Sequence, residues 1–191
     1  MANVLLPPDL QEIINDFEQN ENHGRKLVSN LSAAQLNRQP GEGKSWSILQ
    51  CIEHLSLTNL GYIQVMKPMM ETADPLKFPR REPLQTGLIG RWFLYILEPP
   101  VRMKAPAPNA IVPAPRLESA DVLRQWTETH HDLRSILNAG ATLDLNALKF
   151  RNPFFKPAVM RFGTALRSMS AHERRHIWQA GLIRSRVEAE S

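Results

Sequence analysis

Apolar residues recur at intervals of three and four in four long segments, the spacing of one buried face of an α-helix. The first segment runs from about Leu10 to Leu31 and the second from about Ser45 to Met70. The third runs from about Ser119 to Leu137 and the fourth from about Gly163 to Val187. No alternation of apolar and polar residues is long enough to indicate a β-sheet. The pattern therefore predicts four helices and an all-α protein.

Proline is concentrated in the middle of the chain. Ten of the 15 prolines lie between Pro68 and Pro115, and the same stretch holds the short apolar run Leu88 to Leu97. Because proline has no backbone N–H and interrupts helices, we interpret this stretch as a long crossover that carries one short helix. The expected fold is a four-helix bundle with a long proline-rich crossover between helices two and three.

Composition adds few constraints. The chain has 191 residues, of which 42% are hydrophobic and 22% charged, values typical of a single globular domain spanning residues 1–191. One cysteine excludes a disulfide framework or a multi-cysteine metal site. No apolar run reaches membrane-spanning length, and the first residues lack the pattern of a signal peptide. We therefore expect a cytoplasmic protein with no membrane partner.

The basic residues do not indicate a nucleic-acid partner. Lys and Arg number 23 against 19 Asp and Glu, a net charge of +4. The basic residues are scattered along the chain and are not interleaved with aromatic residues, as they would be in a nucleic-acid-binding patch. We expect a solvated surface and no nucleic-acid partner.

His172 and His176 are the strongest candidates for chemistry. They are four residues apart on the predicted last helix, so their side chains lie one turn apart on one face. A projection at 100° per residue places both within the apolar stripe that includes Met169 and Ile183. Two imidazoles on a core-facing side need partners. A metal ion is one such partner, and hydrogen bonds within the core are the alternative.

The sequence from His172 to His176, HERRH, formally matches the H-E-x-x-H motif of zinc metalloproteases. The extended motif would require glycine and histidine where this chain has Gln179 and Leu182. The projection turns Arg174 and Arg175 outward and Glu173 inward. We therefore expect Glu173 to bond a ligand histidine or a neighbouring helix and not to act as an essential general base.

His54, on the second predicted helix, is the best candidate for a third ligand. It lies beside that helix's apolar stripe, where a lone histidine is more often a core residue. Cys51, three residues earlier, is expected to be a buried small hydrophobe and not a ligand. His23 lies in a polar stretch and is expected at the surface. His130 and His131 diverge by about 100° on the third helix, so at most one faces inward.

Two segments resemble the DinB-like superfamily. Residues 31–59 contain Trp46 and Ser47 at the start of helix two and His54 eight residues after the tryptophan. Residues 150–183 contain His172, His176 and a following glutamine, Gln179. The resemblance implies a four-helix bundle, a divalent metal ion held by His54, His172 and His176, and a homodimer. Trp46 itself is expected to be a packing anchor.

The resemblance also implies a reaction type. Three neutral ligands leave a coordination position open, as in catalytic zinc sites. Zn or Ni, and also Fe, suit imidazole ligands. We expect a metal-dependent enzyme that activates a thiol or water, either a thiol transferase acting on an electrophile or a hydrolase. The alternatives are a non-catalytic metal-binding stress or interaction protein and, less favoured, the metalloprotease.

The long crossover is expected to border the metal pocket. Residues 72–118 are the only connection with enough chain to cover a site between helices two and four. Trp92, Phe93 and Tyr95 could form an apolar wall there, or they could be buried in the core or in a dimer contact.

Overall fold

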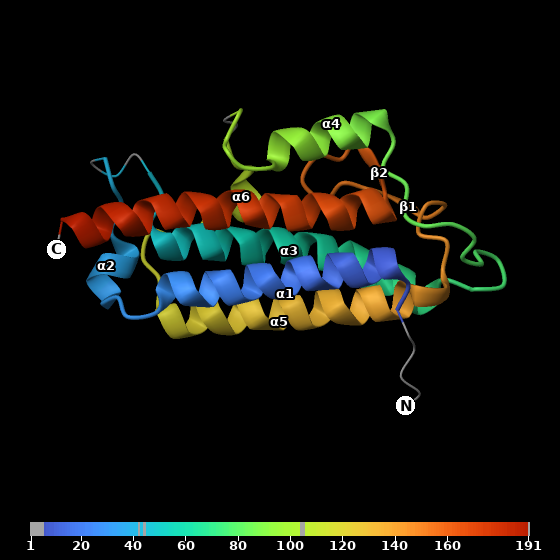
Figure 1. Ribbon diagram of the computed structural model, residues 1–191, viewed down its shortest axis with the longest axis horizontal. Helices are drawn as coiled ribbons and strands as arrows, with labels where there is room; N and C mark the ends of the chain where they lie inside the picture. Colours follow the sequence, from blue (N-terminus) through green and yellow to red (C-terminus); the bar gives the residue numbers. More distant parts are fainter. Residues whose placement is uncertain (1–5, 42, 44, 104–105, 191) are drawn as a thin grey trace.

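The predicted four-helix bundle is confirmed by the computed structural model, which describes residues 6–41, 43, 45–103 and 106–190 (Figure 1). The long helices are α1 (Pro8–Val28), α3 (Ile48–Thr72), α5 (Ser119–Ala139) and α6 (Phe162–Ala189). The shorter elements are α2 (Ala33–Asn37), α4 (Leu88–Leu97) and the 3₁₀ turns η1 (Asn109–Ile111) and η2 (Gly140–Thr142).

The direction of the helices explains the long crossover. In Figure 1, α1 and α6 run one way along the bundle, and α3 and α5 run the other way. Helices α3 and α5 are packed neighbours that run parallel. The chain must therefore return along the length of α3, roughly 37 Å for a helix of this size, before α5 can begin. Helix α4 lies on this return path and packs along the outside of α6.

The helix boundaries differ slightly from the expectation. Helix α1 ends at Val28, and the chain turns at Asn30, whose φ is positive (61°). A short unpredicted helix, α2, follows. Helix α3 begins after Ser47 and not near Ser45, because the Ser47 hydroxyl and the side chain of Gln50 form a capping box.

The expectation that the chain holds no sheet is wrong. Strands β1 (Lys149–Arg151) and β2 (Val159–Arg161) pair antiparallel, with Phe150 opposite Met160. Each strand has three residues and only Phe150 is buried. A strand this short cannot show the alternation on which sequence detection depends.

The interior of the bundle has a polar middle between two apolar ends. One apolar cluster includes Phe17, Met66 and Phe162, and the other includes Ile52 and Trp126. Between them lies a layer of inward-facing polar residues from all four long helices: Asn20, His54, Asn59, His130, His172, Glu173 and His176. Polar groups here require specific partners, so this layer is where chemistry is expected.

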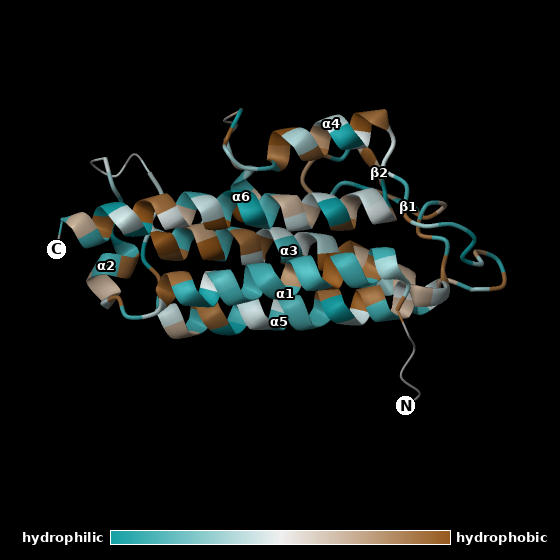
Figure 2. Cartoon of the chain, viewed as in Figure 1, coloured by the Kyte–Doolittle hydropathy of each residue, from teal (hydrophilic) through white to brown (hydrophobic). Residues whose placement is uncertain are grey.

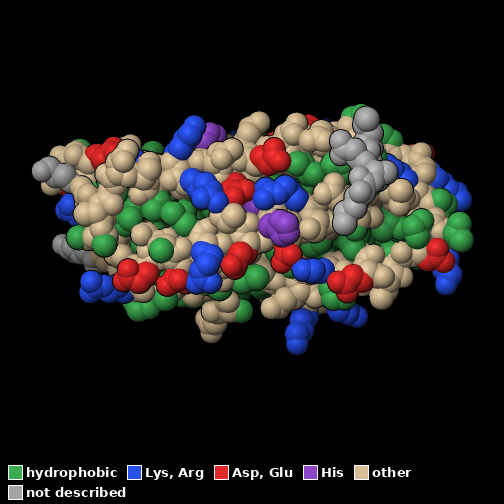
Figure 3. All heavy atoms as spheres, turned by 90° about the horizontal axis from the view of Figure 1, so that it is seen from below, with side chains coloured by type: hydrophobic (Ala, Val, Ile, Leu, Met, Phe, Trp, Pro, Cys, Tyr) green, Lys and Arg blue, Asp and Glu red, His purple; other side chains and the backbone are tan. Residues whose placement is uncertain are grey.

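The surface of the bundle carries one apolar helix and a face of mixed charge. Figure 2 shows that α4 is strongly apolar although it lies on the outside, and none of its residues is buried. On the face viewed in Figure 3, acidic and basic side chains are interspersed, in keeping with the ion pair between Arg134 and Glu21 that links α5 to α1. Among the described residues, no helix combines the length and the apolar character needed to cross a membrane.

Candidate metal site

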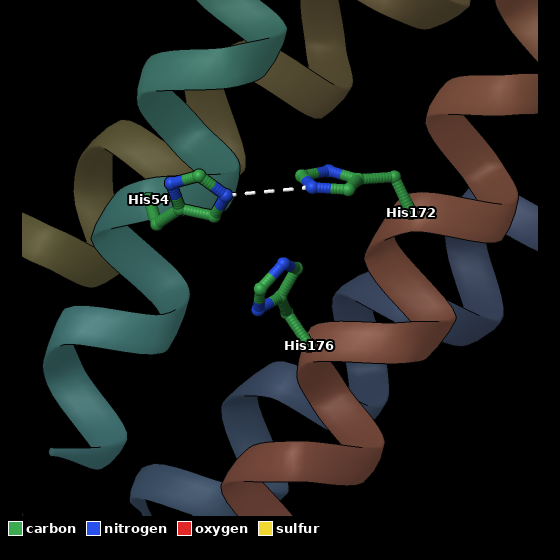
Figure 4. A group of neighbouring side chains, drawn as sticks. All are labelled: His54, His172 and His176. Atoms are coloured by element: carbon green, nitrogen blue, oxygen red, sulfur yellow. Dashed lines mark hydrogen bonds between the residues drawn. The ribbon is translucent and has the colours of Figure 1, made fainter. Parts of the chain in front are cut away.

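His54, His172 and His176 come together at the middle of the bundle. His54 projects from α3 and the other two from α6, and the three rings turn towards one shared space (Figure 4). One ring nitrogen of each lies within 4.8 Å of the others. His54 is buried, whereas His172 and His176 are partly exposed. The structure thus brings together the three residues singled out from the sequence, although their role as metal ligands stays a prediction.

The spacing fits a divalent metal ion. Nε2 of His54 lies 3.4 Å from Nε2 of His172. Zn–N bonds of about 2.0–2.1 Å in tetrahedral geometry place two ligand nitrogens about 3.3 Å apart. The pair already has that separation, and a ring nitrogen of His176 lies within 4.8 Å of both. The donor set also suits the ion, because imidazole is a common ligand of zinc and nickel.

The crossover fixes the orientation of His54. Nδ1 of this ring lies 2.8 Å from the carbonyl oxygen of Ile111, in η1. A carbonyl oxygen can only accept, so Nδ1 carries the proton and Nε2 of the neutral ring presents a lone pair to the shared space. A hydrogen bond to the outer nitrogen that sets the tautomer in this way is typical of metal-binding histidines.

The three imidazoles are held neutral. Burial lowers the pKa of His54, although the bond to Ile111 opposes this. Burial, with contributions from the charges of His54 and Arg175, lowers the pKa of His172 to about 3. Burial and the neighbouring charges also place the pKa of His176 well below its usual value. All three rings are therefore able to bind a metal ion at neutral pH.

The surroundings of the cluster include the crossover and one aromatic ring. The crossover does border the site, through Ile111. Trp92, Phe93 and Tyr95 are 62%, 37% and 60% exposed, so the alternative that they are buried in the core is wrong, and an apolar wall formed by them stays a prediction. The aromatic ring beside the cluster is Trp46, whose centroid lies 4.7 Å from that of His54 and 5.8 Å from that of His176. Trp46 thus lines the site in addition to packing.

Glu173 faces away from the three histidines. Its carboxylate is fully buried and accepts hydrogen bonds from Asn59 (2.8 Å) and Asn20 (3.0 Å). Nε2 of His130 lies 3.4 Å from Oε2 of Glu173. Of the two roles expected for Glu173, the bonds to neighbouring helices are the ones observed. A general base must reach the reacting group, so this geometry disfavours the metalloprotease.

His130 differs from the three clustered histidines. Burial lowers its pKa, but the Glu173 carboxylate, the Trp126 carbonyl and Glu21 together outweigh burial and raise the pKa overall. Its Nδ1 lies 2.8 Å from the carbonyl oxygen of Trp126. Glu173 and the three side chains around it therefore tie α1, α3, α5 and α6 together. We call Asn20, Asn59, His130 and Glu173 the core network.

The remaining sequence candidates lie where expected. His23 and His131 are exposed. Cys51 is buried outside the histidine group, and burial raises the pKa of its thiol to about 12. Arg174 and Arg175 do turn away from the core, as projected, but the crossover covers that side of α6 and both bond to it.

Sequence reasoning missed three contributors to this region. Asn20 and Asn59 carry no motif, and only their position on the inward face of a helix could have marked them. Ile111 acts through its backbone carbonyl, which is the same in every residue type.

Comparison with known proteins agrees with this fold. A model of the DinB superfamily matches residues 16–180, and the chain belongs to that superfamily. Among solved structures, the fold resembles YfiT from Bacillus subtilis, described as a "probable metal-dependent hydrolase with an unusual four-helix bundle topology". That match has a TM-score of 0.60 and 16% identity, and it covers 98% of this chain and 93% of YfiT. No match was found among curated proteins.

Proposed function

We propose that this protein is a metal-dependent enzyme whose single divalent ion is held by His54, His172 and His176. The observation that carries the proposal is the convergence of three neutral imidazoles within 4.8 Å of one another. Zinc or nickel suits these ligands best, and iron is also compatible. When bound, such an ion lowers the pKa of a water or thiol ligand and makes it a nucleophile.

The chain's own residues have separable roles in this proposal. Ile111 sets the tautomer of His54, and Trp46 provides one wall of the site. Partial exposure of His172 and His176 gives a substrate access from one side. Glu173 is engaged in the core network, which is why proteolysis through the H-E-x-x-H motif is the least favoured alternative.

Water and thiol are the two candidate nucleophiles. The family resemblance seen in the sequence supports a small thiol attacking an electrophile. The description of YfiT supports hydrolysis, although that likeness extends to the fold alone. A turnover screen distinguishes them: p-nitrophenyl acetate reports hydrolysis, and chlorodinitrobenzene with cysteine reports thiol transfer. We expect one activity that requires added zinc or nickel and is lost in His176→Ala. Stoichiometric metal with neither activity would favour the non-catalytic alternative.

We further propose that the protein forms a homodimer through α4. Leu88 and Ile89 are each 83% exposed, and Trp92 and Tyr95 extend the same apolar surface. Contiguous exposed apolar side chains are typical of protein contacts. Sedimentation should give a dimer for the wild type and a monomer for Ile89→Glu. A monomeric wild type at tens of micromolar would contradict the proposal.

A further inference from the structure

Arg175 lies next to the histidines of α6 in the sequence, and its side chain is on the side of the helix that the crossover covers. It precedes His176 directly and follows His172 by three residues. Residues three apart on a helix are surface neighbours, with Cβ atoms about 5–6 Å apart. The side chain of Arg175 therefore starts from the shoulder of the helix face that presents the histidines.

The guanidinium of Arg175 is positioned but not neutralised. Its two terminal nitrogens donate to the backbone carbonyls of Ile96 (3.0 Å) and Met103. In the described part of the chain, no ion pair joins Arg175 to a carboxylate. The adjacent Arg174 is different, because Asp16 (2.7 Å) and Glu98 neutralise it.

The crossover therefore holds Arg175 in place over this part of α6. Ile96 lies in the last turn of α4, which runs along α6 in Figure 1, and Met103 follows on the same crossover. Both carbonyls are neutral acceptors, so they hold the guanidinium of Arg175 in place without neutralising its positive charge. A guanidinium has five N–H donors, and bonds to two carbonyls leave others for a ligand.

The positive charge of Arg175 affects two histidines of the cluster. After burial and the other histidines, it is Arg175 that lowers the pKa of both His172 and His176. The three imidazoles are neutral, so the positive charge here is not offset by the cluster. A site with one sign of charge concentrates ligands of the opposite sign, and the guanidinium fork matches the two oxygens of a carboxylate.

We propose that Arg175 recognises an anionic group on the substrate, and that the substrate or its thiol carries a carboxylate beside the reacting atom. This proposal rests on the proposed function for the position of the reacting atom. It assigns Arg175 to binding and specificity, and it leaves metal binding to the three histidines.

The test compares two thiols of the same length, 3-mercaptopropionate and 3-mercaptopropionamide, which differ in charge. Their binding to the zinc-loaded protein is measured by calorimetry. We expect the acid to bind about tenfold tighter or more, the factor that one charge-assisted hydrogen bond provides. Arg175→Met should reduce the acid to the affinity of the amide and leave the amide and the zinc stoichiometry unchanged.

Two further variants serve as a control and as a substitute for Arg175→Met. Arg186→Met removes an exposed arginine from the same helix and should keep the preference for the acid. Arg175→Gln also removes the charge but keeps an N–H donor for a crossover carbonyl, so it replaces Arg175→Met if that variant does not fold. Equal affinities in the wild type, binding of neither thiol, or a preference retained without Arg175 would each overturn the proposal.

Failure of the proposed function would look different. A wild-type protein that binds no zinc refutes the metal site alone. The acid and amide are then compared on the metal-free protein, where the preference should persist, more weakly, because the charge belongs to the chain. A metal-free protein without that preference would overturn the assignment of Arg175 as well.

Discussion

The core network and the three-histidine cluster lie in the same polar layer, and their histidines have different hydrogen-bond partners. His130 has a carboxylate beside one ring nitrogen and a carbonyl at the other. His54 and His172 instead bring two ring nitrogens to 3.4 Å from each other. In the core network the Glu173 carboxylate accepts hydrogen bonds from Asn20 and Asn59, whereas the rings of the three-histidine cluster face one another.

One turn of α6 contributes to both groups. His172 and Glu173 are adjacent on α6, yet they face different groups because successive helical residues diverge by about 100°. Glu173 joins the core network and fixes α6 against the other three long helices. His172 and His176 are thereby presented to His54 from a helix that is held in place.

The largest expected effect is the loss of zinc affinity when a histidine of the cluster is removed. His54→Ala, His172→Ala and His176→Ala should each weaken zinc binding by about a hundredfold or more, since loss of a ligand exceeds the effect of losing an outer partner. Calorimetric zinc titration of untagged protein measures this. His23→Ala, at an exposed position, should bind zinc like the wild type. A variant that keeps full affinity would remove its residue from the ligand set.

The second prediction concerns stability. Glu173→Ala should lower the free energy of unfolding by roughly 3 kcal/mol, because buried partners on three helices lose their acceptor. Urea unfolding measures the loss, and Glu173→Gln, which keeps one acceptor oxygen, should lose less. Zinc stoichiometry should survive in Glu173→Gln. Peptidase activity that disappears in this variant while stability is kept would instead restore the metalloprotease hypothesis.

The third prediction is that the two groups respond to pH with opposite sign. Between about pH 6.5 and 3, the unfolded chain protonates a histidine that folded His172 keeps neutral, with its pKa lowered to about 3. Acidification through this window therefore reduces stability. His130 has a raised pKa, so its contribution is full below pH 6.5 and is lost as pH rises through the folded value.

Unfolding free energies measured against pH check this prediction in the metal-free protein. His172→Leu should flatten the acid side of the curve, and His130→Leu should flatten the slope above pH 6.5. Curves that are unchanged in both variants would contradict the assigned protonation states.

The smallest expected effect is a change in tryptophan fluorescence, because one tryptophan lies beside each group. Trp46 lies 4.7 Å from His54, and Trp126 lies 4.1 Å from His130, between ring centroids. Nickel bound at the cluster should quench part of the fluorescence. That quenching should disappear in Trp46→Phe and persist in Trp126→Phe. The reverse result would place the metal beside the core network.

The sequence predicts the long helices well because each buries a broad apolar stripe. It also identifies His172 and His176, since their partnership is local to one helix. His54 is 118 residues from His172, and only the motif around Trp46 links it to the pair.

Contacts made by backbone atoms or by residues without a motif could not be predicted. The Ile111 carbonyl, the Asn20–Glu173 bond and the crossover's hold on Arg175 depend on how distant segments pack. The three-residue strands escape detection for a related reason, because the hairpin depends on packing around Phe150 more than on a sequence pattern.

The three-histidine ligand set is tested by a crystal structure of zinc-loaded, untagged protein with anomalous data collected at the zinc edge. We expect one strong peak per chain, about 2.0–2.1 Å from a ring nitrogen of each of His54, His172 and His176. A structure with no peak there, or with zinc bound through Glu173 or His130, would contradict it.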